Sequence, residues 1–282
     1  FTGLPGLKAS YGRVPVYPAS PFGTLSHAGP MARTVDDLAL MLNVMSQPDP
    51  RDWYALPFLD CDWCEGLDDG VEGLRIAYSA DLGYANVDAE IAEMVADGAK
   101  LFADLGAHLE NQDPGFDDPT SVFRILWWVG SANAMSAMTP DQIAKLEPGF
   151  RSLAEEGSTI SLADFSAATA ARVALGQFMN HFHEHYDLLV TPTLAVPAFD
   201  AGILAPDGDD DAIRWLRWTP FSYPFNMTGQ PAATVPCGFT KAGLPVGLQI
   251  VGPMHRDDLV LRAAKAFESA RPQPTIAPLG TD

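Results

Sequence analysis

The sequence predicts an α/β protein in which helices pack on the faces of a sheet. Short apolar runs bounded by turn residues alternate with amphipathic helical segments along the chain, which is typical of this class. With 282 residues, 47% of them hydrophobic, the chain is long enough to bury a large core. It contains no internal repeat and no clear linker, so we predict a single domain over residues 1–282.

The first helix is predicted to begin after Thr34, because Thr34 and Asp37 have the spacing of a capping box. Apolar residues then recur at helical spacing: Leu38, Leu42 and Met45. Residues 74–78 follow Gly73 and predict a short strand.

A second helix is predicted between Asp88, a capping residue, and Gly106, which ends it. Its apolar residues again recur at helical spacing: Ile91, Val95, Phe102 and Leu105. Residues 114–160 are helical in character but less regular. Together with the next helix they predict a helical cover at about residues 114–186.

That next helix opens at a capping-box pair, Ser161 and Asp164, and runs to about Tyr186. Residues 188–190 then predict a buried strand that Pro192 stops.

Residues 200–212 are rich in Gly, Pro and Asp and predict an exposed loop, with solvated charges at 209–211. A last helix is predicted from a cap at Asp257 or Asp258 to about Ala270.

Residues 225–252 predict a tightly turned β unit. Small residues, glycines and prolines lie around and within two runs that contain β-branched residues, 233–235 and 246–251. Gly and Pro at such density indicate tight turns and close approach between backbones.

The charge of the chain excludes several function classes. Its net charge is −19, from 36 acidic and 17 basic residues, and such a surface repels phosphates, so we expect no direct binding of nucleic acid.

No apolar run reaches the length of a membrane span and no leader peptide is visible, so we expect no membrane association. Three cysteines do not make a disulfide framework, which favours the cytoplasm.

Two patterns suggest a metal only weakly. Cys61 and Cys64 have CxxC spacing, but Cys237 is the only other thiol. Three histidines share one helix end, where histidines also satisfy terminal carbonyls: His181, His183 and His185. We expect no metal and no cofactor. A metal-dependent hydrolase built from these groups remains an alternative, and it predicts stoichiometric zinc.

The residues alone do not identify a catalyst. The chain has no GxSxG elbow and no serine in a glycine-rich loop that would offer oxyanion-hole amides. We therefore predict no catalytic residue within this chain.

Four segments, in order along the chain, resemble the amidase signature family: residues 1–15, 29–39, 187–193 and 225–252. The resemblance implies a mixed β-sheet covered by helices on both faces. It also implies amide chemistry by a Ser–cis-Ser–Lys triad, in which a buried neutral lysine acts as base through the bridging serine. The matching segments imply that this triad lies upstream of Phe1, with the nucleophile only a few residues away. We therefore expect the 282-residue chain alone to be inactive towards amides.

Six residues are candidates for a substrate pocket. Trp127 and Trp128 form an aromatic pair that lines either a pocket or a core. By resemblance, four consecutive residues face the pocket: Phe225, Asn226, Met227 and Thr228. Asn226 is alternatively a turn or cap residue. Arg13 either anchors the segment behind the nucleophile loop or forms an ordinary surface ion pair.

Two branches of the family and one non-enzyme remain possible. The stretch 215–222 before Asn226 is aromatic and apolar without an acidic residue, which favours an amidase acting on a small apolar or aryl amide. The alternatives are the A subunit of a tRNA-dependent glutamine amidotransferase and a non-catalytic binding protein that retains the fold. A chain starting at Phe1 is expected to have unpaired strand edges, which leaves open whether it forms a homodimer.

Overall fold

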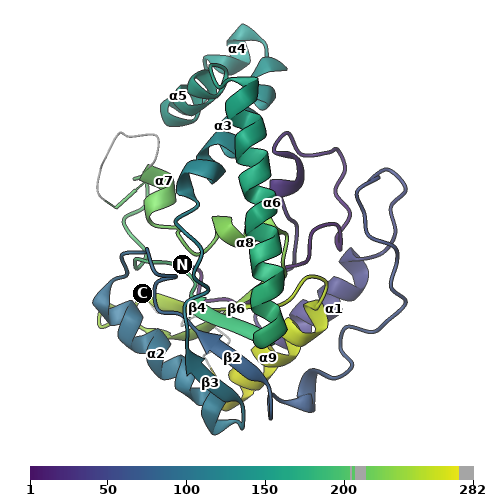
Figure 1. Cartoon of the computed structure of the whole chain (residues 1–282), viewed down its shortest axis with the longest axis vertical. Helices are drawn as coiled ribbons and strands as arrows, with labels where there is room; N and C mark the ends of the chain where they lie inside the picture. Colours follow the sequence, from purple (N-terminus) through teal and green to yellow (C-terminus); the bar gives the residue numbers. More distant parts are fainter. Residues whose placement is uncertain (204, 207–213, 273–282) are drawn as a thin grey trace, which may run out of the picture.

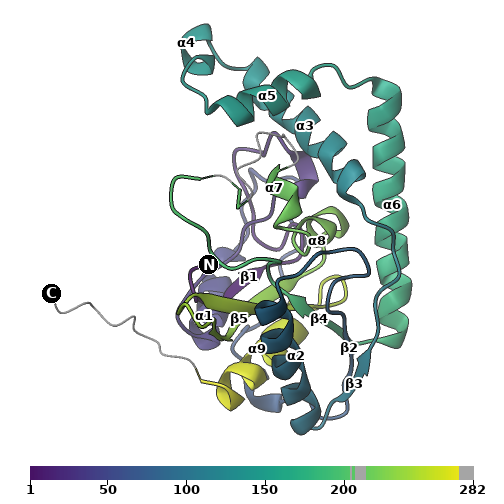
Figure 2. The same cartoon turned by 90° about the vertical axis from the view of Figure 1, so that its left-hand side faces the viewer.

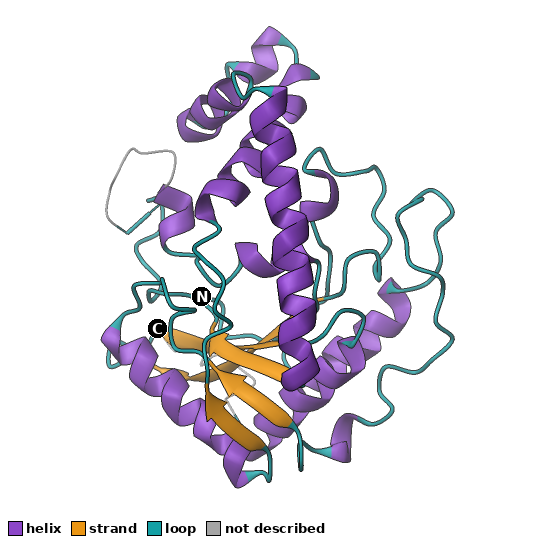
Figure 3. Ribbon diagram, in the orientation of Figure 1, coloured by secondary structure: helices purple, strands orange, loops and turns teal. Residues whose placement is uncertain are grey.

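The protein is built on one mixed six-stranded sheet, described by a computed structural model that covers residues 1–203, 205–206 and 214–272. In spatial order the strands are β1 (Gly6–Lys8), β5 (Ala232–Phe239), β6 (Pro245–Val251), β4 (Leu188–Pro192), β2 (Arg75–Tyr78) and β3 (His108–Asn111). Strands β4, β2 and β3 run parallel, whereas β1, β5, β6 and β4 pair antiparallel in turn (Figure 3). The predicted α/β class is confirmed.

Alternation along each strand divides the apolar side chains between two cores, one on each face of the sheet. The first core includes Ile76, Val190 and Ile250. Their neighbours one position along the strands belong to the second core: Ala77, Leu189 and Val251. Helices therefore cover both faces, as the family resemblance implies.

Three helices cover the first core: α1 (Val35–Met45), α2 (Ala89–Asp104) and α9 (Asp257–Ala270). The Thr34 hydroxyl accepts the Asp37 N–H at 3.1 Å, and the Asp88 carboxylate accepts the Glu90 N–H at 2.9 Å, so both predicted helix starts are confirmed. The predicted cap of α9 is wrong. Arg256 is the residue before its first turn, and the Asp257 carboxylate turns away to accept hydrogen bonds from Ser10.

The second core is covered mainly by α3 (Thr120–Ser136), α6 (Leu162–His185) and α8 (Tyr223–Thr228). Figures 1 and 2 show α6 running along one side of the molecule, from the sheet to a group formed with α3, α4 (Pro140–Ile143) and α5 (Pro148–Gly157). The start of α6 is as predicted, because Ser161 accepts the Asp164 N–H at 3.1 Å. The exact extent of a helical cover at 114–186 stays a prediction.

Residues 232–251 form the tightly turned β unit that the sequence predicts, with β5 and β6 paired antiparallel and a register shift between Pro236 and Gly238. A Cβ at Gly247 would lie 2.7 Å from Thr193 Oγ1 and 2.8 Å from Thr234 Oγ1, so the close approach is real. The preceding residues differ from the expected β unit, since they form helix α8, which ends at Gly229 with φ of 75°.

The outer edge of β1 is partly paired. Gly6 bridges Met31, the Leu7 N–H donates to the Pro30 carbonyl at 2.9 Å, and the Ala32 N–H donates to the Pro5 carbonyl at 3.2 Å. Residues 30–32 thus form a strap along this edge, so the β1 edge is partly paired and not open as expected, while β3 is the strand at the other edge.

Two further sequence expectations can be placed only in part. Residues 204 and 207–213 lie outside the described residues, and with them most of the predicted loop at 200–212 and its charges at 209–211. Within the described part of the chain, none of the helices has the length and apolar character that crossing a bilayer requires.

Candidate functional site

A large apolar pocket of about 480 Å³ lies between α3, α8, the short helix α7 (Arg214–Arg217) and the segment that carries Phe199 and Ile203. We call it the aromatic pocket. Its lining consists of Phe123, Trp127, Trp128, Phe199, Ile203, Leu216, Trp218, Thr219, Ser222, Tyr223 and Asn226. Its volume and lining suit a small aromatic or apolar ligand.

Helix α3 supplies one wall. Phe123 and Trp127 are one turn apart, so their rings stack, with centroids 5.3 Å apart. Phe22 also stacks on Trp127, with ring centroids 4.1 Å apart. Trp128 is almost wholly buried and its indole N–H donates to Glu156 Oε2 at 3.1 Å. Trp127 is therefore the more accessible ring of the pair.

Helix α8 supplies a second wall through Tyr223 and Asn226, together with Ser222, the residue before its first turn. The Tyr223 ring stacks on Phe123 of α3, with centroids 5.2 Å apart. The Tyr223 hydroxyl lies 2.6 Å from Thr120 Oγ1, and burial raises the pKa of Tyr223 to about 12. The phenol thus stays protonated at neutral pH and joins α8 to the start of α3. Asn226 donates its Nδ2 hydrogen to the Leu25 carbonyl at 2.9 Å.

The structure separates the six predicted pocket residues into two groups. Trp127, Trp128 and Asn226 line the aromatic pocket. The other three are buried in the second core or beside it and do not line it: Phe225, Met227 and Thr228.

The start of the chain lies beside the aromatic pocket. Phe1 stacks on Trp218, with ring centroids 5.3 Å apart and planes 11° apart, and meets Phe199 edge-on at 5.4 Å. The indole N–H of Trp218 is buried and, within the described residues, has no hydrogen-bond partner. Neither Phe199 nor Trp218 is among the predicted pocket residues. The aromatic character of 215–222 is a signal for Trp218, and the sequence carries none for Phe199.

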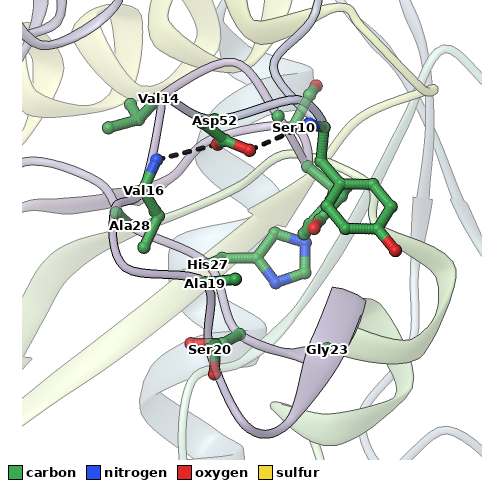
Figure 4. Close-up of a pocket in the computed structure, with 13 residues that line it drawn as sticks. Ser10, Val14, Val16, Ala19, Ser20, Gly23, His27, Ala28 and Asp52 are labelled. Atoms are coloured by element: carbon green, nitrogen blue, oxygen red, sulfur yellow. Dashed lines mark hydrogen bonds between the residues drawn. The ribbon is translucent and has the colours of Figure 1, made fainter. Parts of the chain in front are cut away.

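A second, much smaller hollow of about 40 Å³ lies near Ser10, His27 and Asp52 (Figure 4). Burial and the nearby charge of Lys8 lower the pKa of His27 to about 3, so its ring is neutral. Asp52 accepts the N–H groups of Val16 and Tyr54 at 2.8 and 2.9 Å. These groups hold the loop together, and the hollow is too small for a substrate of drug-like size.

Arg13 is a buried anchor, not a surface ion pair. Its guanidinium lies 3.5 Å from Asp257, whose side chain is fully buried, and 5.2 Å from the centre of the Trp63 ring. Asp257 also accepts the backbone N–H and the hydroxyl of Ser10, at 2.7 and 2.8 Å. This cluster fixes the first segment of the chain to α9.

The groups considered for a metal lie apart. Cys61 and Cys64 are free thiols, and Cys237 is buried, with its pKa raised to about 12 by burial. His183 is buried against the Tyr186 carbonyl, and burial lowers its pKa to about 4. In the described ranges, the His, Cys, Asp and Glu side chains form no cluster of three or more that would hold an ion.

Comparison with known proteins gives a consistent result. A family model described as Amidase matches residues 1–261. The acylamidase of Rhodococcus erythropolis is 35% identical over 276 residues, which span 96% of this chain and 58% of that protein. The A subunit of the glutamyl-tRNA(Gln) amidotransferase of Ligilactobacillus salivarius (strain UCC118) is 29% identical over 300 residues, which span 96% of this chain and 60% of that protein.

Solved structures agree with these relatives. A bacterial aryl acylamidase belonging to the amidase signature enzymes superposes with a TM-score of 0.84 at 30% identity, over 97% of this chain and 59% of that one. A 6-aminohexanoate cyclic dimer hydrolase superposes with a TM-score of 0.85 at 25% identity, over 98% of this chain and 62% of that one. The chain thus spans about three fifths of the length of the relatives it matches.

Proposed function

Because the chain belongs to the amidase signature family, we propose that the full-length protein hydrolyses the C–N bond of small aryl or apolar amides. In this proposal the aromatic pocket binds the apolar part of the substrate. The triad that the family resemblance implies is supplied from upstream of Phe1.

The observation that carries the proposal is the contact between Phe1 and the pocket. Phe1 stacks on Trp218, which itself lines the aromatic pocket. A nucleophile loop only a few residues upstream of Phe1 would stay close to that pocket, because each extended residue spans at most about 3.5 Å. A bound amide would then have its apolar group among aromatic rings and its carbonyl beside the serine.

The composition of the pocket favours a neutral substrate. Its lining, as far as the described residues show, contains aromatic, aliphatic, hydroxyl and amide side chains and no charged one. A free amino acid such as glutamine carries two charges, and binding them in an apolar site without partners is unfavourable. The acylamidase relative and the aryl acylamidase structure point in the same direction.

The second candidate is the A subunit of an amidotransferase, because several relatives carry that name at 28–30% identity. The two candidates predict different substrate preferences. We expect the full-length protein to hydrolyse acetanilide with a higher kcat/KM than glutamine, measured by release of aniline and of ammonia. A preference for glutamine over aryl and aliphatic amides would reverse our choice.

Residues 1–282 alone are expected to release no aniline from acetanilide, since removing a nucleophile lowers turnover by about a millionfold. The comparison is made between this chain and the full-length protein, with circular dichroism to show that each is folded. Turnover by the folded 282-residue chain at the full-length rate would refute an upstream triad.

The cytoplasm remains our proposed location, supported by the three free cysteines.

A further inference from the structure

Asn226 lines the aromatic pocket, and one hydrogen bond fixes the orientation of its amide group. Its amide group approaches the Leu25 carbonyl at 2.9 Å, and a carbonyl only accepts, so the atom facing Leu25 is the nitrogen. The oxygen Oδ1 therefore points elsewhere. Among the described residues nothing donates to Oδ1, and it is not sealed from solvent.

The other polar atoms of the pocket differ from Oδ1. The indole N–H of Trp218, which has no partner among the described residues, is a donor and is sealed from solvent. The Tyr223 hydroxyl is engaged with Thr120, and the Trp128 indole N–H is engaged with Glu156. Thr219 and Ser222 carry hydroxyls, which both donate and accept. The amide oxygen of Asn226 can only accept, and the lining to which Asn226 belongs is mainly apolar.

Arg172 on α6 binds the residues adjacent to both partners of this orienting hydrogen bond. Its Nε donates to the carbonyl of Met227, the residue after Asn226, at 2.6 Å. Its two terminal nitrogens donate to Thr24 Oγ1 at 2.7 Å and to the Thr24 carbonyl at 3.1 Å. Thr24 precedes Leu25 in the short 3-10 helix η1 (Gly23–Leu25). One half-buried guanidinium thus fixes η1 and α8 relative to each other.

We propose that Asn226 Oδ1 selects ligands that combine an aromatic ring with an N–H donor, and that Arg172 is the positioning residue for it. The inference deepens the proposed function and rests on it for the identity of the substrate, an anilide or a related aryl amide with an N–H. The ring is held among Phe123, Trp127 and Trp218, while the N–H donates to Asn226. A ligand without the donor leaves that oxygen without a partner, which discriminates more strongly than a difference in apolar size.

The test uses two rigid ligands of nearly equal shape, indole and benzofuran, which differ in a ring N–H. Binding to the full-length protein is measured by titration calorimetry, and it needs no hydrolysis. We expect indole to bind about tenfold more tightly than benzofuran, the effect of one hydrogen bond. Equal affinities in the wild-type protein overturn the inference, whether or not any variant folds.

Variants then assign the effect to its residues. Asn226→Leu is expected to remove the preference for indole while benzofuran binding stays within about twofold, and Asn180→Leu, at an exposed position on α6, is the matched control. Arg172→Met is expected to reduce the preference and Arg172→Lys to restore part of it, since lysine still donates to one acceptor. A preference unchanged in Asn226→Leu overturns the inference.

The two proposals fail separately. Hydrolysis of acetanilide without any preference for indole refutes the role of Asn226 and leaves the amidase proposal intact. A preference for indole in a protein that hydrolyses no amide refutes the amidase proposal and supports the role of Asn226.

Discussion

Lys8 places an amino group inside the protein. It lies on β1, and its Nζ donates to the Gln230 carbonyl. Burial lowers the pKa of Lys8 to about 7, although the negative charge of Asp257 opposes the change. Burial is the main cause of the low pKa of His27, and a neutral amine at Lys8 relieves the repulsion that lowers this pKa further. The first segment of the chain therefore carries a charge that depends on pH near neutrality.

This burial predicts a pH-dependent stability. In the unfolded chain the pKa of Lys8 is near 10.5, and in the folded protein it is about 7, so between these values the unfolded chain binds more protons. The free energy of unfolding contributed by Lys8 must then rise as pH increases from about 7 to about 10.5. Urea unfolding of wild type and Lys8→Met at pH 7 and pH 9.5 measures this difference.

The wild-type protein should gain stability relative to Lys8→Met at the higher pH. Lys145→Met, at an exposed lysine, is the control and should show no such trend. A wild-type advantage that is the same at both pH values contradicts a depressed pKa at Lys8.

The strands β4, β5 and β6 are held together by unusually close contacts. Thr193, just after β4, and Thr234 on β5 share a hydrogen bond of 2.6 Å, and Gly247 on β6 faces both hydroxyls. Only a glycine leaves room for this pair. The result is a rigid centre of the sheet next to the residues that lead into the aromatic pocket.

Gly247→Ala is therefore expected to lower the free energy of unfolding by about 1–3 kcal/mol, because its Cβ forces the threonine pair apart. Gly176→Ala, on α6, is the opposite control. No atom lies within 4 Å of a Cβ there, and alanine should stabilise the helix by about 0.5–1 kcal/mol. Equal effects of the two substitutions in urea unfolding contradict this explanation.

Helices with a capping residue and a long apolar stripe were predictable, whereas short elements were not. Asp88 and Ser161 each mark a start that the structure confirms, because a cap hydrogen bond is a local event. Helix α8 has six residues, too few to show a period, and its Pro224 and the Gly229 that ends it are equally typical of turns. The prediction that Asp257 caps α9 was wrong because its carboxylate accepts a hydrogen bond from Ser10, a residue 247 positions away.

The residues of the candidate site were predictable only where they are neighbours in the sequence. Trp127 and Trp128 stand together in the sequence, and that pairing is what indicates a pocket or a core. Phe199, Trp218 and Phe1 meet only after the chain folds, so no spacing in the sequence indicates their contact. Arg172 was missed for the same reason, since its acceptors lie 148 and 55 positions away.

The whole molecule carries a large excess of negative charge. Its net charge is −19 over 282 residues. Such a charge favours solubility and repels anions, but it destabilises the compact state through self-repulsion. A neutral aryl amide is neither attracted nor repelled, which suits the aromatic pocket, since the described residues that line it carry no charge.

Salt should therefore stabilise the protein. Raising NaCl from about 0.05 M to about 0.5 M shortens the range of the repulsion to a few ångströms, so the Tm should rise. Scanning calorimetry of the full-length protein measures it. Over the same range the KM for a neutral amide should be unchanged, and a Tm that falls with salt would show that attractive ion pairs dominate.

The strap at residues 30–32 hinders self-association of the molecule through the edge of its sheet. It occupies backbone groups at the edge of β1 that another chain would otherwise pair with. Its approach depends on Gly29, since a Cβ there would lie 1.8 Å from the Leu7 carbonyl oxygen. Gly29→Ala would move the strap away from β1 and expose this strand edge. Exposed β1 edges of different molecules would then pair with each other, and the solution would become turbid on storage.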